Sequence, residues 1–162
     1  MSCESTAYTN SGSKVYVSLV NPSTYDQTGF EALTWLEVKP VSNIGDFGGE
    51  SNLVTFDPVG TGVVNKHKGS VNYGAMTLDC ARDPDDVGQA ALLTAGANSY
   101  KSDIAFKIAH NDTPSGGSTP TTQYFQAKVM NEKPTSMGGV NDIVSATYNV
   151  EVNCEIIEVA AA

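Results

Sequence analysis

The sequence predicts a mainly β protein with one flanking α-helix, at about residues 84–95. Hydrophobic residues make up 40% of the 162 residues and charged residues only 17%, and much of the remainder is Gly, Ser, Thr and Asn. This composition is typical of strands and turns rather than of a helical bundle. About seven segments alternate apolar and polar residues, which is the period of a strand with one buried face. The length suggests a single domain over residues 1–162.

The helix is predicted from the signals at its two ends. Asp83 is a good N-cap, because its carboxylate can accept hydrogen bonds from the free N–H groups of the first turn. Pro84 suits the first helical position, where its missing donor costs nothing. Asp85 and Asp86 place negative charge at the positive end of the helix dipole, and Gly96 is a C-terminal stop.

The sides of this helix leave two interpretations open. One stripe at helical spacing is formed by Val87, Ala90, Ala91 and Thr94, and Leu92 and Leu93 fall off it. A surface helix needs one apolar face, whereas this helix has apolar residues on more than one side. It either lies in a groove of its own domain or packs on its own sheet under a neighbouring subunit. The second interpretation makes Val87, Leu92 and Leu93 candidate interface residues.

The predicted strands lie at residues 14–20, 33–38, 71–79, 103–109, 124–130 and 144–156, with shorter ones possible at 53–56 and near Val63. The last segment is the longest and most regular, with apolar side chains at its even positions. Period two places these in a core and the odd positions on a wet face. The wet face consists of Ser145, Thr147, Asn149, Glu151, Asn153 and Glu155.

Three segments without clear periodicity are expected to lie outside the body of the domain. They are a polar N-terminal arm at residues 1–13, a long loop excursion at 40–68 and a flexible loop at 111–122. Long loops are usually functional or disordered, so Asp46, Phe47 and His67 are candidate contacts with another subunit. His67 also belongs to a small basic cluster, Lys66–Lys68, for which a solvated loop is the favoured interpretation.

Charge and cysteine usage bound the partners and the compartment. The net charge of −9 disfavours tight binding of a phosphate backbone, which needs clustered Lys and Arg. Cys3, Cys80 and Cys154 are far apart and odd in number, which favours a reduced, cytosolic protein over a disulfide framework. The N-terminus predicts no signal peptide, and no apolar run approaches the ~20 residues that span a bilayer.

No pattern of catalytic residues is found in the sequence. His67 and His110 are the only histidines and both fall in loop-like sequence, whereas a zinc site needs several His or Cys at short spacing. Asp83, Asp85 and Asp86 could suggest Ca²⁺, but the glycine and the later Glu of a calcium loop are missing. The sequence therefore predicts no enzyme, no cofactor and no metal.

Several motifs together resemble the tail tube (major tail) proteins of long-tailed bacteriophages. They are the strand Trp35–Val38, the stretches 41–56 and 68–83, the pattern D-x-G-Q-x-x-L-x-x-A formed by Asp86, Gly88, Gln89, Leu92 and Ala95, and F-Q-A-K-V-M-N-E-K-P followed by a glycine-bearing turn. Their order and spacing carry the resemblance. The immunoglobulin-like C-terminal appendix of some relatives is not seen, so the chain resembles a bare tube domain.

This resemblance implies a β-sandwich or partly closed barrel with one flanking helix. It also implies a virion protein, made in the host cytoplasm, that forms stacked six-membered rings with itself and contacts other tail proteins. The tube would be a negatively charged conduit for genome delivery, through which double-stranded DNA passes without tight binding. The wet face is then either outer surface or lumen wall, and we favour the lumen because the face is free of Lys and Arg and, apart from its two Glu residues, short-chained. The candidate lumen residues are Thr147, Asn149, Glu151, Asn153 and Glu155.

Two other functions stay open from the sequence. One is another virion component, either a tail terminator or a decoration protein. The other is a monomeric carbohydrate-binding sandwich, which would need aromatic residues exposed on one sheet face. The tyrosines are instead scattered along the chain, at positions 8, 16, 25, 73, 100, 124 and 148.

Overall fold

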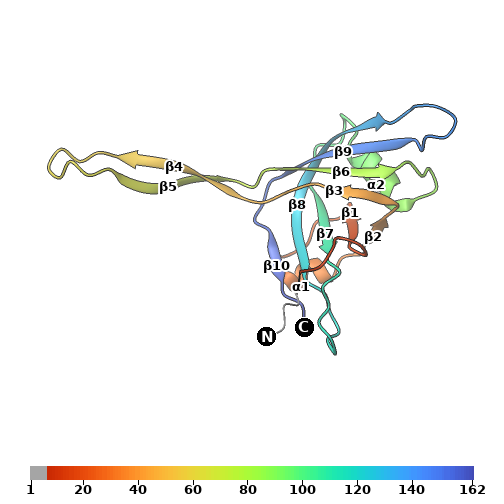
Figure 1. The fold of residues 1–162 in the computed structure, drawn as a ribbon, viewed down its shortest axis with the longest axis horizontal. Coiled ribbons are helices and arrows are strands. Elements are labelled where there is room, and N and C mark those ends of the chain that lie inside the picture. Colours follow the sequence, from red (N-terminus) through yellow and green to blue (C-terminus); the bar gives the residue numbers. More distant parts are fainter. Residues whose placement is uncertain (1–6) are drawn as a thin grey trace.

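The computed structural model describes residues 7–162, which form one large antiparallel sheet, one separate hairpin and two helices (Figure 1). The strands of the large sheet are β1 (Lys14–Ser18), β2 (Leu36–Val38), β3 (Val41–Ile44), β6 (Ala75–Ala81), β7 (Ile104–Ala109), β8 (Thr122–Thr135), β9 (Ser145–Val152) and β10 (Ile157–Val159). The hairpin is β4 (Glu50–Phe56) with β5 (Asn65–Asn72), and the helices are α1 (Gln27–Glu31) and α2 (Val87–Ala95). The sheet order is β2-β1-β7-β8-β9-β6-β3, with β10 paired to β8.

Strand β8 is the corner around which the sheet bends. Residues 122–127 pair with β7, and residues 127–135 pair with β9. A register shift between Val129 and Asn131 interrupts the second pairing, and such bulges bend a strand. In Figure 1, β8 accordingly runs across the direction of β9, β6 and β3. The predicted mainly β fold, a sandwich or partly closed barrel, is confirmed.

The bend lets the two halves of the sheet share one core. Val15 and Val17 of β1 belong to the same buried cluster as Leu78 of β6 and Val150 of β9. The rings of Phe106 and Phe125 stack within this cluster, with centroids 5.3 Å apart. Burying each side chain of this size contributes roughly 1.5–3 kcal/mol, so the shared core holds the bend closed.

Helix α2 covers this core, but it begins later than the sequence predicts. The N-cap is Asp86, whose side chain accepts from the backbone N–H of Gln89 at 2.8 Å. Asp83 is not the cap: its carboxylate accepts from the N–H of Asp85 in a preceding turn. Both residues are good caps by type, and the contacts of Asp86 with the body of the domain decide between them. Gly96 ends the helix as predicted.

The helix also faces the core with a different side from the predicted stripe. Its buried residues are Gly88, Gln89, Ala91, Leu92 and Ala95. Val87, Ala90 and Thr94 are exposed. The stripe was misassigned because a buried Gln and a buried Gly do not register in an apolar pattern.

Helix α1 is a second correction, because the sequence predicts only a turn-rich connection there. Asp26 caps it by accepting from the N–H of Gly29 at 2.7 Å. The helix places Phe30 in a second small cluster with Ala105 and Tyr124, on the outer face of the sheet. Five residues are too few to show helical periodicity in a sequence.

The predicted loop excursion at 40–68 is in fact mostly regular. Residues 41–44 belong to the main sheet as β3, and residues 50–72 form the β4–β5 hairpin, which projects far from the body in Figure 1. Every residue of β4 is exposed, so the strand has no buried face and no apolar–polar alternation to reveal it. Lys66–Lys68 consequently lies on a strand and not in a loop.

Other boundaries shift for local reasons. Gly74, with φ +77°, separates β5 from β6 within the predicted strand 71–79. The strand predicted at 33–38 begins at Leu36. Strand β8 continues through Pro134 to Thr135, beyond the predicted end at residue 130. The loop before it ends at residue 121 and is tied to the C-terminus, since the carbonyl of Ala162 accepts from the N–H groups of Ser118 and Thr119.

Part of the predicted N-terminal arm, residues 1–6 with Cys3, lies outside the described residues; residues 7–13 form no helix or strand. Across residues 7–162, none of the helices has the length and apolar character to cross a membrane.

Candidate assembly surfaces

The wet face predicted for the last strand is present along β9. The even positions Ala146, Tyr148, Val150 and Val152 are buried, and the odd positions point away from the core. The odd side chains are ordered by their neighbours in the sheet: Thr147 donates to the carboxylate of Asp79, and the Asn149 amide donates to Asn131 at 2.5 Å. Since β9 lies between β8 and β6, the face is the centre of a wider polar surface.

Two of the predicted lumen residues are not part of this face. Strand β9 ends at Val152, and the chain then turns to reach β8 as β10. Asn153 lies beyond the strand end, where its amide donates to Asp103 at 2.9 Å. Glu155 accepts from the Tyr25 hydroxyl through its backbone carbonyl. The alternation in the sequence continues past the strand end, because Cys154 and Ile156 are also partly buried.

Neighbouring strands add cations that the sequence of β9 does not show. Lys128 of β8 lies opposite Glu151, and Lys133 lies opposite Thr147. The Lys128 ammonium also pairs with Asp103 at 2.5 Å. The expectation of a face free of Lys therefore fails for the assembled sheet. With Asp79 and Glu151 on the same surface, this polar surface is close to charge balance.

The other half of the outer sheet face is covered by the chain itself. Helix α1, the segment around Trp35 and strand β10 pack over Ala105 and Tyr124. The Trp35 indole donates to the carbonyl of Phe30 at 3.1 Å. Lys107 lies over the Tyr16 ring, 5.1 Å from its centroid. Within residues 7–162, the half formed by β3, β6, β9 and the end of β8 is left open as a polar surface.

The β4–β5 hairpin exposes apolar side chains on a ribbon without a core. Leu53, Phe56 and Val63 are 66%, 61% and 63% exposed. The register places Leu53 opposite Lys68, Val54 opposite His67 and Phe56 opposite Asn65. One face therefore carries Leu53 with the two lysines, and the other carries Val54 and Phe56 with His67. An isolated two-stranded ribbon with this much exposed apolar surface is marginal in water.

The other two predicted contacts of this segment, Asp46 and Phe47, differ in their exposure. Asp46 is exposed and lines a shallow hollow with His110. Phe47 is half-buried and its ring lies 5.3 Å from that of Phe125, so it anchors the base of the hairpin to the core. Phe47 is therefore a packing residue of its own domain.

The three candidate interface residues of the helix also differ in their exposure. Leu92 is 0% exposed and belongs to the main core, so it cannot contact a neighbour. Leu93 and Val87 are 48% and 59% exposed and remain available to a partner. The burial of Leu92 in its own domain is compatible with both interpretations of the helix, and cover by a neighbouring subunit stays a prediction.

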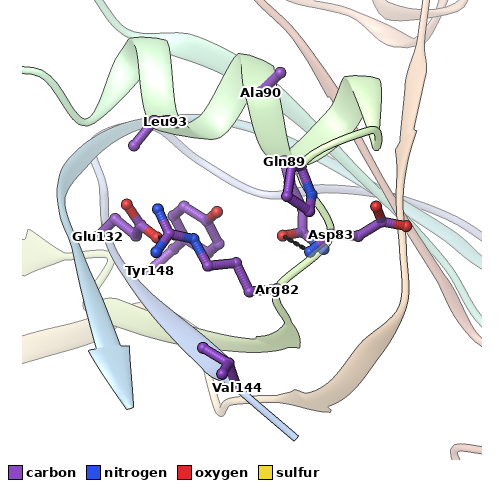
Figure 2. A pocket seen from close by; sticks show the side chains of 9 residues that line it. Arg82, Asp83, Gln89, Ala90, Leu93, Glu132, Val144 and Tyr148 are labelled. Carbon is purple, nitrogen blue, oxygen red and sulfur yellow. Dashed lines mark hydrogen bonds and ion pairs between the residues drawn. The ribbon is translucent and has the colours of Figure 1, made fainter. Parts of the chain in front are cut away.

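A groove beside α2 was not predicted from the sequence. It encloses about 440 Å³ and is lined by Arg82, Asp83, Pro84, Gln89, Ala90, Leu93, Glu132, Val144 and Tyr148. Figure 2 shows Leu93 on the helix and Val144 on the opposite side, with Arg82, Glu132 and Tyr148 between them. Arg82 pairs with Glu132 at 3.5 Å, and burial raises the pKa of Tyr148 to about 12, helped by the charge of Glu132. These residues come from separate segments, so no sequence motif joins them.

The loop between β8 and β9 adds exposed apolar residues next to this groove. Met137, Val140 and Ile143 are 70%, 101% and 72% exposed. Val144 joins the loop to the groove lining. Single exposed apolar residues are ordinary, but these three lie close together in the sequence and adjoin the groove beside α2.

Residues 7–162 contain no group of three or more His, Cys, Asp or Glu side chains placed to hold a metal ion. The Asp86 carboxylate, one of the acidic group considered for Ca²⁺, is used as the helix cap.

Comparison with known proteins finds similar solved structures but no matching sequence. No protein-family model and no curated protein sequence matches the chain. The structure is similar to a chain in the sheath/tube terminator of the extracellular contractile injection system PVC, with a TM-score of 0.69, 14% identity and coverage of 98% of this chain and 100% of that chain. A chain in the baseplate of the anti-feeding prophage gives a TM-score of 0.72 at 11% identity, over 97% and 98% of the two chains.

The tail tube of SPP1 is also similar, with a TM-score of 0.60, 14% identity and coverage of 91% of this chain and 76% of that chain. At such identities the similarity concerns the fold. The resemblance drawn from the sequence motifs is confirmed at that level. The chain therefore has the fold of the tail tube proteins of phages and contractile injection systems.

Proposed function

We propose that this chain is a structural tail protein that assembles with itself into stacked rings and so forms a hollow tube. The observation that carries the proposal is the β4–β5 hairpin, a long ribbon with apolar side chains on both faces and no cover from its own domain. A second copy would supply that cover. The tube fold supports the same conclusion, because the similar structures are parts of tubes, caps and baseplates.

A six-membered ring is the assembly we favour. The similar anti-feeding prophage baseplate is six-fold symmetrised, and the fold of this chain matches it along nearly the whole length of both chains. Identical subunits that contact each other through two different surfaces close into a ring when the rotation allows it. Exposed Val87 and Leu93 on α2 and the loop around Val140 are the apolar surfaces available for contacts between copies.

The open polar surface of the sheet is our candidate for the lumen wall. It presents Ser145, Thr147, Asn149 and Glu151 from β9. The Thr147 hydroxyl is bonded to a carboxylate and the Asn149 amide to another amide, and the charge is nearly balanced. Such a surface offers a polyanion neither a docking site nor a high barrier. Double-stranded DNA would slide along such a wall without tight binding. The apolar hairpin and α2 groove suit this role less well, because they would attract protein surfaces.

A tail terminator is the second candidate, because terminator and cap structures match as well as tube structures do. The PVC terminator and the anti-feeding prophage cap give TM-scores of 0.69 and 0.65, against 0.63 for the PVC sheath-tube complex. The two functions differ in what the pure protein builds. A tube protein polymerises without limit, and a terminator stops at a single ring.

The experiment that tests the proposal removes the hairpin. Deleting Glu50–Asn72 joins Gly49 to Tyr73 across the hairpin base, where Glu50 and Asn72 are paired. The shortened protein should keep its far-UV circular dichroism and cooperative unfolding but form no tubes in negative-stain micrographs. A full-length control with Leu53, Phe56 and Val63 changed to Thr keeps the ribbon and loses its apolar surface. It should also fail to polymerise; normal tubes from the deletion variant would refute the hairpin's role.

A further inference from the structure

We propose that the groove beside α2 is a binding site for an aliphatic secondary amide, which is the chemistry of a peptide bond next to a Leu or Val side chain. The groove encloses about 440 Å³. Small-ligand sites usually enclose roughly 300–1,000 Å³. The site belongs to the single chain and does not depend on the proposed assembly. Two polar groups in the groove, which lack hydrogen-bond partners among the described residues, point to this chemistry.

The first of these groups is the hydroxyl of Tyr148. This residue is 2% exposed and lines the groove, yet within residues 7–162 its hydroxyl has no hydrogen-bond partner. Burial and, after it, the charge of Glu132 raise the pKa of Tyr148 to about 12, so the hydroxyl keeps its proton at neutral pH. A buried tyrosine usually donates this proton to an acceptor. The groove therefore contains a hydrogen-bond donor that the domain does not use.

The second group is the carboxylate of Glu132. Its side chain is 11% exposed, and its ion pair with Arg82 Nε is 3.5 Å long. Among the residues that the structure describes, this carboxylate accepts no hydrogen bond, although an ionised carboxylate offers about four acceptor sites. The Arg82 side chain is 43% exposed, so solvent reaches its other N–H groups. Glu132, by contrast, is a nearly buried acceptor that needs a donor.

An amide matches this pair because it carries one donor and one acceptor close together. Its N–H would donate to Glu132, and its carbonyl would accept from the hydroxyl of Tyr148. Figure 2 shows both side chains between Leu93 on the helix and Val144 on the opposite side. A ligand that covers these two groups must replace the bonds that they otherwise make with solvent, and an amide replaces both.

The walls of the groove select the rest of the ligand. Leu93, Pro84 and Val144 line it, and burying a branched aliphatic group against them supplies affinity. A sugar fits less well, because its hydroxyls would lack partners along these walls. A carboxylate would be repelled by Glu132 and by Asp83 at the rim, and an ammonium group would offer no acceptor to the Tyr148 hydroxyl.

Matched small probes test the assigned chemistry. N-isobutylacetamide is compared with isobutyl acetate, isobutylammonium and isovalerate, which share its isobutyl group but lack the amide. N-acetylglucosamine shares the acetamide and lacks the aliphatic group. Saturation-transfer NMR on the full chain, at concentrations below assembly, measures the binding of each probe. The isobutyl amide should bind saturably with a Kd of roughly a millimolar, and every other probe about five- to tenfold more weakly.

Two conservative variants assign the hydrogen bonds. Glu132→Gln and Tyr148→Phe should each weaken binding of the amide by about five- to tenfold. Because Tyr148→Phe removes an unpaired hydroxyl, it should not lower the melting temperature, and a fall of more than ~4 °C would show that the hydroxyl has a structural partner. Glu31→Gln and Tyr8→Phe make the same changes at exposed positions outside the groove and should leave binding unchanged.

Three results would overturn the site. They are the absence of saturable amide binding, equal binding of the amide and the ester, and unchanged amide binding by Tyr148→Phe. Stronger binding of N-acetylglucosamine than of the isobutyl amide would assign the groove to acetylated sugars and contradict the aliphatic ligand. None of these results affects the proposed tube function, since all are measured on the unassembled chain. A chain that never forms tubes refutes that function and leaves the amide site standing.

Discussion

Gln89 is the residue on which the attachment of α2 depends. It is 3% exposed, and its amide group donates to the carbonyls of Lys39 at 3.0 Å and Ala81 at 2.8 Å. Its side-chain oxygen accepts from the N–H of Asp83 at 3.2 Å. Next to it, Gly88 allows the helix to touch β2, since a Cβ there would lie 2.3 Å from the carbonyl of Glu37.

These contacts explain the D-x-G-Q-x-x-L-x-x-A pattern in structural terms. Asp86 caps the helix and also accepts from the N–H of Lys39 at 3.3 Å. Leu92 and Ala95 complete the set with their place in the core. The pattern is a device for docking a helix on a sheet, and it carries no chemistry of its own.

Removing the Gln89 side chain should therefore destabilise the domain. Gln89→Ala leaves two carbonyls and one N–H without their partner, and we expect a loss of about 2–4 kcal/mol in the free energy of unfolding. Urea denaturation followed by tryptophan fluorescence measures it. The control is Gln27→Ala at the exposed start of α1. Among the described residues the Gln27 side chain donates to Glu31, and its loss should cost under ~0.5 kcal/mol. Equal effects would contradict the docking role.

The two adjacent leucines of α2 should behave in opposite ways. Leu92→Ala creates a cavity in the core and should cost about 2–5 kcal/mol of unfolding free energy, whereas exposed Leu93→Ala should change it by less than ~0.5 kcal/mol. Sedimentation should show the reverse order for assembly: Leu93→Ala weakens it more than its stability effect explains. A stable Leu92→Ala protein would mean that this side chain does not lie in the core.

At the scale of elements, the sequence predicts best the strands whose side chains alternate between a buried and an exposed face. The alternation of β9 identifies its core side chains correctly, and the end signals locate α2 to within a few residues. Only parts of the hairpin β4–β5 are predicted, at residues 53–56 and 71–72, because both faces of the hairpin are exposed in the single chain. The groove beside α2 escapes it because Arg82, Glu132 and Val144 meet only after folding.

The hairpin should also differ from the sheet in its local stability. In the unassembled protein its amides have few buried neighbours, so hydrogen exchange of residues 50–72 should be complete within seconds to minutes while β9 stays protected. Assembly should slow exchange in the hairpin and in the start of α2 together. Mass spectrometry of peptides before and after assembly measures both segments. Protection of the hairpin already in the monomer would show that its own domain covers it.

At the scale of the whole molecule, the chain presents different surfaces at different places. In Figure 1 the hairpin projects at one end of the molecule, away from α2, and the strands β3, β6 and β9 of the open polar surface belong to the body of the bent sheet. In the proposed tube, this separation would let one subunit bind neighbouring copies and still expose a polar wall.

The polar wall can be tested by changing its charge. Glu151→Lys replaces an exposed anion on the candidate lumen face, and each subunit of a ring repeats the change. Tubes of this variant should retain DNA at low salt and release it steeply as salt rises. Glu31→Lys on exposed α1 makes the same change of charge elsewhere and serves as the control. Equal retention by both variants, measured by co-sedimentation with short duplex DNA, would remove Glu151 from the lumen.

Cryo-electron microscopy of the purified protein across a range of concentrations is the measurement that tests self-assembly most directly. We expect hollow tubes of stacked rings, with a reconstruction in which each hairpin contacts a neighbouring copy. Single closed rings that never lengthen would favour the terminator function. A chain that stays monomeric at every concentration, or that forms filaments without a central channel, would contradict the proposed tube.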